Sequence, residues 1–174
     1  MFTKIAKGFD ELADVGLVER KAVRFVGAQP EGCAPVATAF AEGVDTIRPV
    51  RDPDTIVRSL AIGSPADGSY ALELARRTGG SIEAVPDAAT AAAIRRTAAS
   101  EGIFVETAGG VTVAAIEAAA ARGVIRSGDE VVAILSGNGL KTPDARRFGA
   151  GDDLDALTAP IAPTYAAFEA AGIA

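Results

Sequence analysis

The sequence contains no histidine and no tryptophan, and it has a single cysteine, Cys33. Without imidazole, the usual nitrogen ligand of metal sites is absent, and we expect no metal site. Ser–His and Cys–His nucleophile pairs are also excluded within the chain. One cysteine excludes an internal disulfide framework and is typical of a reducing compartment, and we expect it to be a small buried hydrophobe. Acid–base chemistry must therefore come from Lys, Asp, Glu or a cofactor.

Basic clusters and long apolar runs are absent as well. The chain has 17 Lys and Arg against 23 Asp and Glu, a net charge of −6, and no basic run. Nucleic-acid binding needs a basic patch, so we expect no nucleic-acid partner. No stretch approaches the roughly 20 apolar residues of a membrane helix. The amino terminus has the pattern of an amphipathic helix and not of a signal peptide. These features predict a cytoplasmic protein without a membrane partner.

Hydrophobic periodicity predicts alternating strands and helices along the 174 residues. This alternation is typical of the α/β class with a mainly parallel sheet. Asp87 has the position of an N-cap, and the alanine-rich helix that follows residue 110 is expected deep in the structure. The predicted helices span residues 3–17, 36–43, 69–77, 87–100, 111–122 and 163–171, and the predicted strands span 23–28, 81–85 and 130–135.

Residues 131–141 (Val-Val-Ala-Ile-Leu-Ser-Gly-Asn-Gly-Leu-Lys) are the stretch around which the chain is organised. Five consecutive apolar residues predict a strand that is buried on both faces. The strand ends at Ser136, and the glycines of Gly137-Asn138-Gly139 let the backbone turn sharply beside a ligand. Because open α/β sheets bind ligands at the carboxyl ends of their strands, we predict a ligand site here. The alternative is a strand followed by a tight turn.

Three earlier segments strengthen this interpretation. They are Ala-Gln-Pro-Glu-Gly-Cys-Ala-Pro at 28–35, Ile-Gly-Ser-Pro-Ala at 62–66 and Glu-Gly-Ile-Phe-Val-Glu-Thr-Ala at 101–108. Together with residues 131–141, and in this order, they resemble threonine synthase. That family is one of the tryptophan-synthase-β-like, fold-type II enzymes, which use pyridoxal 5′-phosphate (PLP). The resemblance covers less than half of such an enzyme, namely its carboxyl-terminal part.

The resemblance implies a fold and a division of the chain. The expected architecture is a three-layer, mainly parallel sheet with helices on both faces. Residues 1–149 would form the carboxyl-terminal half of the PLP-binding domain, and residues 150–174 a tail with a short helix.

The resemblance also implies a set of cofactor-binding residues. In the family a Ser or Thr at the position of Ser136 hydrogen-bonds the pyridine nitrogen of PLP. Glu106 and Thr107 match a segment beside the cofactor at the start of a helix, although Thr107 replaces a proline. Gly63 and Ser64 match a Gly-Asn pair near substrate and cofactor. The alternatives are a helix-end carboxylate for Glu106 and plain turns for the others. The full predicted set is Ser136, Gly137, Asn138, Gly139, Glu106, Thr107, Gly63 and Ser64.

No catalytic residue is assigned, because the family's Schiff-base lysine is missing. The four lysines are Lys4, Lys7, Lys21 and Lys141, and none lies in a Ser-x-Lys-Asp type motif. The family's phosphate loop is missing too. Lys141 follows the segment that faces the ring nitrogen and so matches a different family position.

The whole family enzyme converts O-phospho-L-homoserine and water into L-threonine and phosphate, a PLP-dependent carbon–oxygen lyase reaction. By resemblance this chain is part of such an enzyme and is inactive alone. Its expected partners are a small amino-acid substrate once the enzyme is complete, and either a separate amino-terminal chain or a second copy. The alternatives are part of a cysteate synthase or a threonine dehydratase, and a non-catalytic interaction module.

Overall fold

The computed structural model describes residues 1–143, 145 and 161–172. Two parallel strands, β1 (Val26–Pro30) and β2 (Ser81–Val85), pair in register from Val26 opposite Ser81 to Pro30 opposite Val85. The helices are α1 (Phe2–Asp14), α2 (Pro35–Glu42), α3 (Gly68–Arg77), α4 (Asp87–Glu101), α5 (Thr107–Ala121) and α6 (Tyr165–Ala170). Short 3-10 turns occupy Glu31–Cys33, Arg58–Leu60 and Gly139–Lys141. The predicted boundary between residues 149 and 150 lies outside the described residues.

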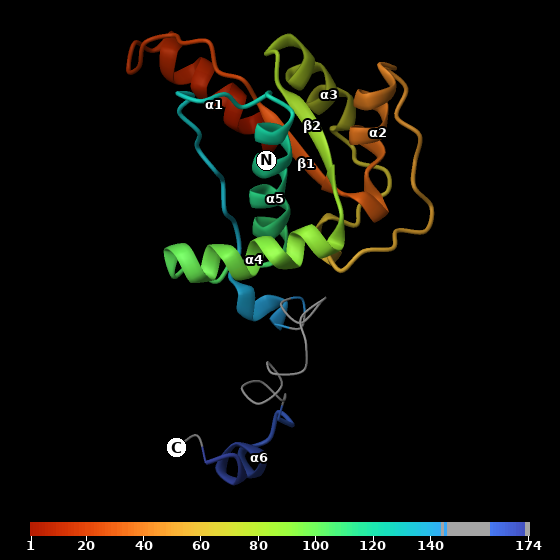
Figure 1. The fold of residues 1–174 in the computed structure, drawn as a ribbon, viewed down its shortest axis with the longest axis vertical. Helices are drawn as coiled ribbons and strands as arrows, with labels where there is room; N and C mark the ends of the chain where they lie inside the picture. The colour runs from red at the N-terminus through yellow and green to blue at the C-terminus, as the bar shows by residue number, and fades with distance from the viewer. Residues whose placement is uncertain (144, 146–160, 173–174) are drawn as a thin grey trace.

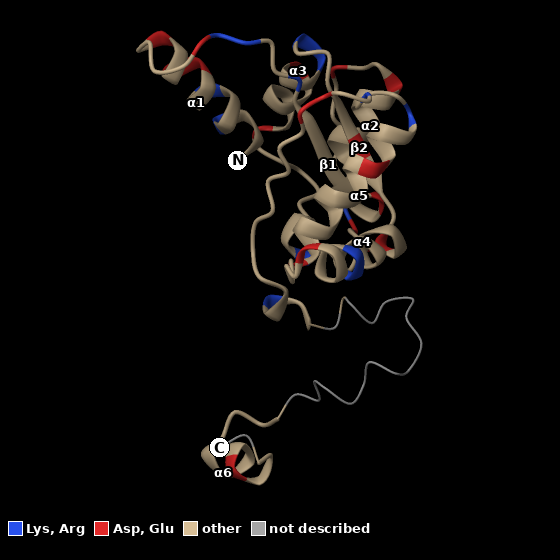
Figure 2. Cartoon of the chain, turned by 60° about the vertical axis from the view of Figure 1, so that its left-hand side comes forward, with Lys and Arg blue, Asp and Glu red and all other residues tan. Residues whose placement is uncertain are grey.

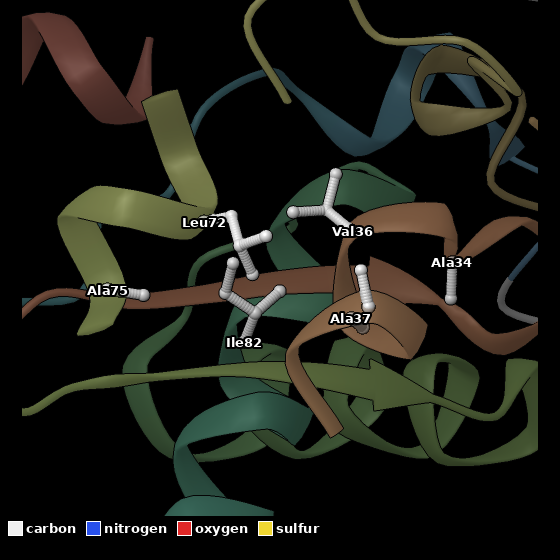
Figure 3. Packing of buried hydrophobic residues seen from close by; sticks show 7 residues of the cluster. Ala34, Val36, Ala37, Leu72, Ala75 and Ile82 are labelled. Carbon is white, nitrogen blue, oxygen red and sulfur yellow. The ribbon is translucent and has the colours of Figure 1, made fainter. Parts of the chain in front are cut away.

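The described elements form three layers. Helices α2 and α3 cover one face of the two strands, and α5 covers the other, with α4 packed on α5 (Figure 1). Successive side chains of β2 point to opposite faces. Ile82 therefore packs with Val36 and Leu72 on the α2–α3 side (Figure 3), whereas Val85 packs with Val111 on the α5 side. The predicted three-layer α/β architecture is confirmed.

A side chain from β1 caps helix α2. The amide oxygen of Gln29 accepts hydrogen bonds from the backbone N–H groups of Val36 and Ala37, at 2.9 and 3.0 Å. These two groups lie in the first turn of a helix and have no partner inside it. The helix ends at Gly43, whose φ of 71° is the left-handed conformation that glycine adopts readily. The segment 28–35 thus joins the strand to the helix that covers it.

Helix α5 is as deeply placed as its alanines predict, but it begins at Thr107 and not at residue 111. Gly109 and Gly110, which the sequence favours as a break, lie inside the helix. A Cβ on Gly110 would lie 2.7 Å from Ile94 Cγ1 and 2.8 Å from the Thr90 carbonyl oxygen of α4. Glycine at this position therefore allows α4 and α5 to approach each other closely.

The predicted central strand at residues 130–135 is wrong for this structure. These residues form no strand, and Val132 is 83% exposed. Residues 130–136 make no backbone hydrogen bond with any other part of the chain that the structure describes. A strand needs a neighbour that pairs with its backbone groups, and neither β1 nor β2 lies beside this segment as a pairing partner. An apolar run predicts that burial is favourable, but it does not supply the pairing partner.

The flanks of this segment are fixed, although the segment itself is unpaired. On the amino-terminal side, Arg24 donates hydrogen bonds to the Asp129 carboxylate and to the Val124 carbonyl. The Arg126 backbone N–H and the Arg24 guanidinium hold the pKa of Asp129 below its usual range. On the carboxyl-terminal side, residues 137–142 contact the start of α5. The unpaired stretch therefore spans two anchored points.

Replacement of Gly110 by alanine should destabilise the protein, although alanine is the better helix former. The added methyl group must push α4 and α5 apart, at a cost of about 1–3 kcal/mol. The measurement is the free energy of unfolding in urea. Gly8→Ala is the matched control, because a Cβ on Gly8 in α1 would meet no atom within 4 Å. That change should stabilise the helix by about 0.5–1 kcal/mol. Equal effects of the two changes would contradict the close approach of α4 and α5.

Candidate cofactor site

The amino terminus of α5 lies at the carboxyl ends of the two strands. Val85, the last residue of β2, packs with Val111 in the second turn of α5. At the other end of the helix, Arg122 pairs with the buried carboxylate of Glu83, in the middle of β2. The helix therefore runs antiparallel to β2, and its first residues project beyond the strand ends. This is the edge where α/β sheets bind ligands.

A turn distant in sequence lies against this helix start. Residues 137–142 contact residues 104–107 through backbone hydrogen bonds and one bridge. The contacts are the Glu106 N–H to the Gly137 carbonyl at 3.4 Å, the Gly139 N–H to the Phe104 carbonyl at 2.9 Å, and a single antiparallel bridge between Val105 and Asn138.

Glu106 is the buried charge of this cluster. Its side chain is 8% exposed, and its Oε2 lies 3.2 Å from Lys141 Nζ. Gly137 lies against the same carboxylate, since a Cβ on Gly137 would be only 2.0 Å from Glu106 Oε1. Gly137 also has a φ of 80°, which other residues rarely adopt. Two independent constraints therefore require glycine at position 137.

Asn138 and Gly139 shape the turn. The Asn138 side-chain oxygen accepts a hydrogen bond from the Leu140 N–H at 2.9 Å and so caps the 3-10 turn Gly139–Lys141. A Cβ on Gly139 would lie 2.5 Å from the ring of Phe104. Both residues serve the contact between the turn and the helix start. The predicted ligand role of Asn138 thus competes with a hydrogen bond inside its own turn.

Thr107 carries an unsatisfied buried hydroxyl. Its backbone N–H donates to Thr142 Oγ1 at 3.3 Å. Its own Oγ1 is buried and has no hydrogen-bond partner in the part of the chain that the structure describes. Such an orphaned group costs about 1–3 kcal/mol, and native proteins rarely keep one without a ligand or water to satisfy it.

Ser136 lies at the edge of the same cluster, immediately before Gly137. The residue is half-buried, and no hydrogen bond of its hydroxyl to another described residue is found. Its hydroxyl is therefore free to bind a ligand. The structure places Ser136 next to Gly137, which contacts Glu106, without forming the strand that the sequence predicts before it.

Gly63 and Ser64 belong to a different region. The Gly63 carbonyl accepts a hydrogen bond from the Val50 N–H at 2.9 Å, and a Cβ on Gly63 would lie 1.8 Å from the Val50 carbonyl oxygen. Ser64 is exposed. Among the described residues, no hydrogen bond or ion pair joins these two to the cluster at α5. The glycine is thus required by a close backbone approach within its own loop.

Three residues play parts that local sequence patterns do not reveal. Lys141 and Thr142 contact Glu106 and Thr107, about 35 positions away, and no local signal marks such a pairing. Asp87, predicted as an N-cap, instead accepts hydrogen bonds from Thr55 Oγ1 and the Ile56 N–H, at 2.6 and 2.8 Å. It ties the loop before α3 to the start of α4.

Cys33 behaves as expected. It is fully buried, and burial raises the pKa of its thiol, so the uncharged form dominates at neutral pH. The residue acts as a small hydrophobe beside α2.

Comparison with known proteins assigns the family. A model of the family described as "Pyridoxal-phosphate dependent enzyme" matches residues 1–137. The chain belongs to this family. The threonine synthase of Methanocaldococcus jannaschii is 35% identical over 141 residues, which are 81% of this chain and 35% of that protein. The threonine synthase of Mycobacterium tuberculosis is 36% identical over 138 residues, 79% of this chain and 36% of its own length. The predicted resemblance to threonine synthase is confirmed.

Solved structures agree on the fold. The processed form of threonine deaminase isoform 2 from Solanum lycopersicum superposes with a TM-score of 0.64 at 21% identity, covering 86% of this chain and 41% of that one. An L-serine ammonia-lyase from Rhizomucor miehei gives a TM-score of 0.58 at 21% identity, over 80% of this chain and 44% of that one. At such identity the likeness concerns the fold alone. The chain spans about a third of the length of the curated relatives.

Other parts of the described surface show different features. A cavity of about 320 Å³ lies between α1 and residues 18–23, with Phe9, Ala13 and Val23 in its lining. It shares no residue with the cluster at α5. Acidic and basic side chains are interspersed over the elements (Figure 2). Within the described ranges, no helix is long and apolar enough to cross a membrane, and no group of three or more His, Cys, Asp or Glu side chains is placed to hold a metal ion.

The residues present fit one side of PLP, the cofactor that the family uses. The Thr107 and Ser136 hydroxyls, which have no hydrogen-bond partner among the described residues, supply polar groups, and Gly137 lets the turn lie against Glu106. The chain carries neither the lysine motif nor the phosphate loop that would hold the other side. The cluster therefore offers one wall of a candidate cofactor site.

Replacement of Thr107 by valine should stabilise the free chain. Valine keeps the shape of threonine and removes a buried hydroxyl that has no partner, for a gain of up to about 1 kcal/mol. The measurement is the free energy of unfolding in urea. Thr90→Val is the matched control, because Thr90 is equally buried but its Oγ1 donates to the Pro86 carbonyl at 3.2 Å. The control should lose about 0.5–1 kcal/mol. A loss of stability at Thr107 as large as at Thr90 would show that the Thr107 hydroxyl is already satisfied.

Proposed function

We propose that this chain supplies the carboxyl-terminal part of a PLP-dependent enzyme of the threonine synthase type. The observation that carries the proposal is the cluster at the start of α5. Glu106 lies against Gly137, about 30 residues away in sequence, Thr107 is hydrogen-bonded to Thr142 of the same turn, and Ser136 directly precedes Gly137. These are the positions that the resemblance assigns to the cofactor. The reaction of the complete enzyme is the conversion of O-phospho-L-homoserine and water into L-threonine and phosphate, a biosynthetic step expected in the cytoplasm.

Each residue of the cluster has a distinct part in this proposal. The Ser136 hydroxyl would hydrogen-bond the pyridine nitrogen, and the Thr107 hydroxyl would find its missing partner in the cofactor. Glu106 sets the electrostatic potential of the wall beside them. Gly137 and Gly139 let the turn close against Glu106 and Phe104, and Gly63 and Ser64 belong to a second wall of the complete site. The cofactor, when bound, supplies an electron sink for the amino-acid substrate.

The chain needs a further polypeptide segment for activity. None of its lysines lies in the family's Schiff-base motif, and it spans about a third of the relatives' length. Residues 131–134 support this need, because they are apolar and exposed and make no backbone hydrogen bond to other described residues. A strand of the remaining part of the fold satisfies their backbone groups and covers their side chains. The segment that pairs here is therefore the one that carries the lysine and the phosphate loop.

The first experiment treats the chain alone with PLP and then with borohydride, which reduces any Schiff base to a stable adduct. Mass spectrometry should find no PLP on any lysine beyond the level seen with urea-unfolded chain. No phosphate should be released from O-phospho-L-homoserine. A stable adduct on Lys141 of the folded chain would mean that a lysine of this chain performs the family's covalent step.

The second experiment completes the fold. In a chimera, this chain replaces the 141 matching residues of the Methanocaldococcus jannaschii threonine synthase. The chimera should bind PLP and release phosphate, and Ser136→Ala should lower kcat by about tenfold or more. Ser59→Ala, at an exposed position in the 3-10 turn Arg58–Leu60, is the matched control and should have no effect.

The chimera also separates the rival functions. Ammonia release from L-threonine without phosphate release would favour a dehydratase. A folded chimera that binds no PLP would refute the proposal and leave an interaction module.

A further inference from the structure

Lys141 and Glu106 form an ion pair between an exposed side chain and a buried one. The Lys141 side chain is 65% exposed, whereas that of Glu106 is 8% exposed, and their charged atoms are 3.2 Å apart. Burial of a carboxylate is costly unless a positive charge or hydrogen bonds compensate it. The N-terminal dipole of α5 contributes favourable potential at Glu106, and Lys141 is the cation that the structure places in contact with it. An exposed lysine thus supports a charge inside the proposed site.

Hydrogen bonds hold the turn that carries Lys141 against the start of α5. Asn138 caps the 3-10 turn Gly139–Lys141 through the Leu140 N–H. The next residue, Thr142, accepts a hydrogen bond from the Thr107 N–H. Two successive residues of the turn therefore contact two successive residues at the start of α5. Together with the backbone bonds of Gly137 and Gly139, they form a clasp between residues 137–142 and 104–107.

The clasp matters because, just before it, the Leu135 side chain packs against the cluster of Ile94 and Val105 but the backbone is not hydrogen-bonded to other described residues. Residues 130–136 make no backbone hydrogen bond to other described residues. The position of Ser136 is therefore set by the packing of Leu135 on one side and, on the other, by the hydrogen bonds of the clasp through Gly137. Gly137 lies against the Glu106 carboxylate, the group that Lys141 contacts.

We propose that Lys141 is a positioning residue of the site. Through Glu106, it holds the turn against α5 and so sets where Ser136 and Gly137 lie. Its part at the cofactor rests on the function proposed above. Lys141 does not touch the reacting atoms. Loss of its charge leaves Glu106 buried without a cation among the described residues and loosens the clasp.

Three variants isolate this role. Lys141→Met removes the charge and keeps most of the side-chain length, whereas Lys141→Arg keeps the charge. Lys7→Met is the matched control, because Lys7 forms a pair with Glu11 at 3.1 Å in which both side chains are more than 60% exposed. Exposed pairs of this kind contribute little to stability.

The first readout is amide hydrogen exchange in the full 174-residue chain, followed by NMR. The reporting amides are those of Thr107 and Gly139, whose hydrogen bonds cross the clasp. Lys141→Met should lower their protection by about fivefold or more, Lys141→Arg should restore it, and Lys7→Met should leave it unchanged. Equal protection in Lys141→Met and Lys7→Met would overturn the proposal.

The second readout is the dissociation constant for PLP in the chimera described above. Lys141→Met and Glu106→Gln should each raise it by about threefold or more, and the double variant should be no weaker than the single ones, since the two residues act as a pair. Lys141→Arg should recover most of the affinity. Additive effects, or an unchanged constant in Lys141→Met, would overturn the positioning role.

Failure of the proposed function and failure of the positioning role of Lys141 would give different results. If the unsubstituted chimera does not bind PLP, the proposed function fails, and the exchange data decide by themselves whether Lys141 holds the clasp.

Discussion

The close packing of α5 between α4 and the two strands is the constraint on which the rest of the structure depends. Small side chains make it achievable, because Gly110 meets α4 with no room for a Cβ and Ala114 and Ala115 are buried against the α5-side core. The Glu83–Arg122 pair fixes the far end of the helix on β2. With both ends held, the first residues of α5 are placed at the carboxyl ends of the strands, where they have a well-defined position for a ligand.

The cluster at this position contains buried polar groups, one of which lacks a hydrogen-bond partner that a ligand can supply. The orphaned Thr107 hydroxyl reduces the stability of the free chain, and the buried Glu106 carboxylate is compensated there only by its pair with Lys141 and by the helix terminus. Proteins retain such groups chiefly where a ligand or a partner compensates them. The exposed apolar stretch 131–134 carries a similar cost, because its backbone groups make no hydrogen bond to other described residues. Both destabilising features occur in a chain that spans about a third of its relatives' length. The rest of the fold and the cofactor, when present, would relieve both.

Local sequence patterns predicted where helices and strands form more accurately than they predicted which elements pair with one another. β2 was predicted residue for residue, because its alternating polarity reflects a strand with two different faces. The Gly43 end of α2 and the depth of α5 also follow from local composition. The strand at 130–135 was wrong, since its pairing depends on residues far away or outside the described chain.

In the candidate site too, motifs indicated individual residues but not the contacts between residues far apart in sequence. The positions of Glu106, Thr107 and Ser136 were predicted from a resemblance in motifs, and the structure brings them close together. The ion pair with Lys141 and the hydrogen bond to Thr142 were not predictable, because each joins residues about 35 positions apart. Gly63 and Ser64 were grouped with the site by motif, yet the described contacts of Gly63 lie within its own loop.

The most direct test of the central claim is to map where PLP binds on this chain. Backbone amide signals of the ¹⁵N-labelled 174-residue protein are recorded by NMR while PLP is added. We predict the largest shifts at residues 106–107 and 136–139, where the start of α5 meets the turn. Shifts concentrated instead at the cavity beside α1, around Phe9, Ala13 and Val23, would contradict the assignment of the site.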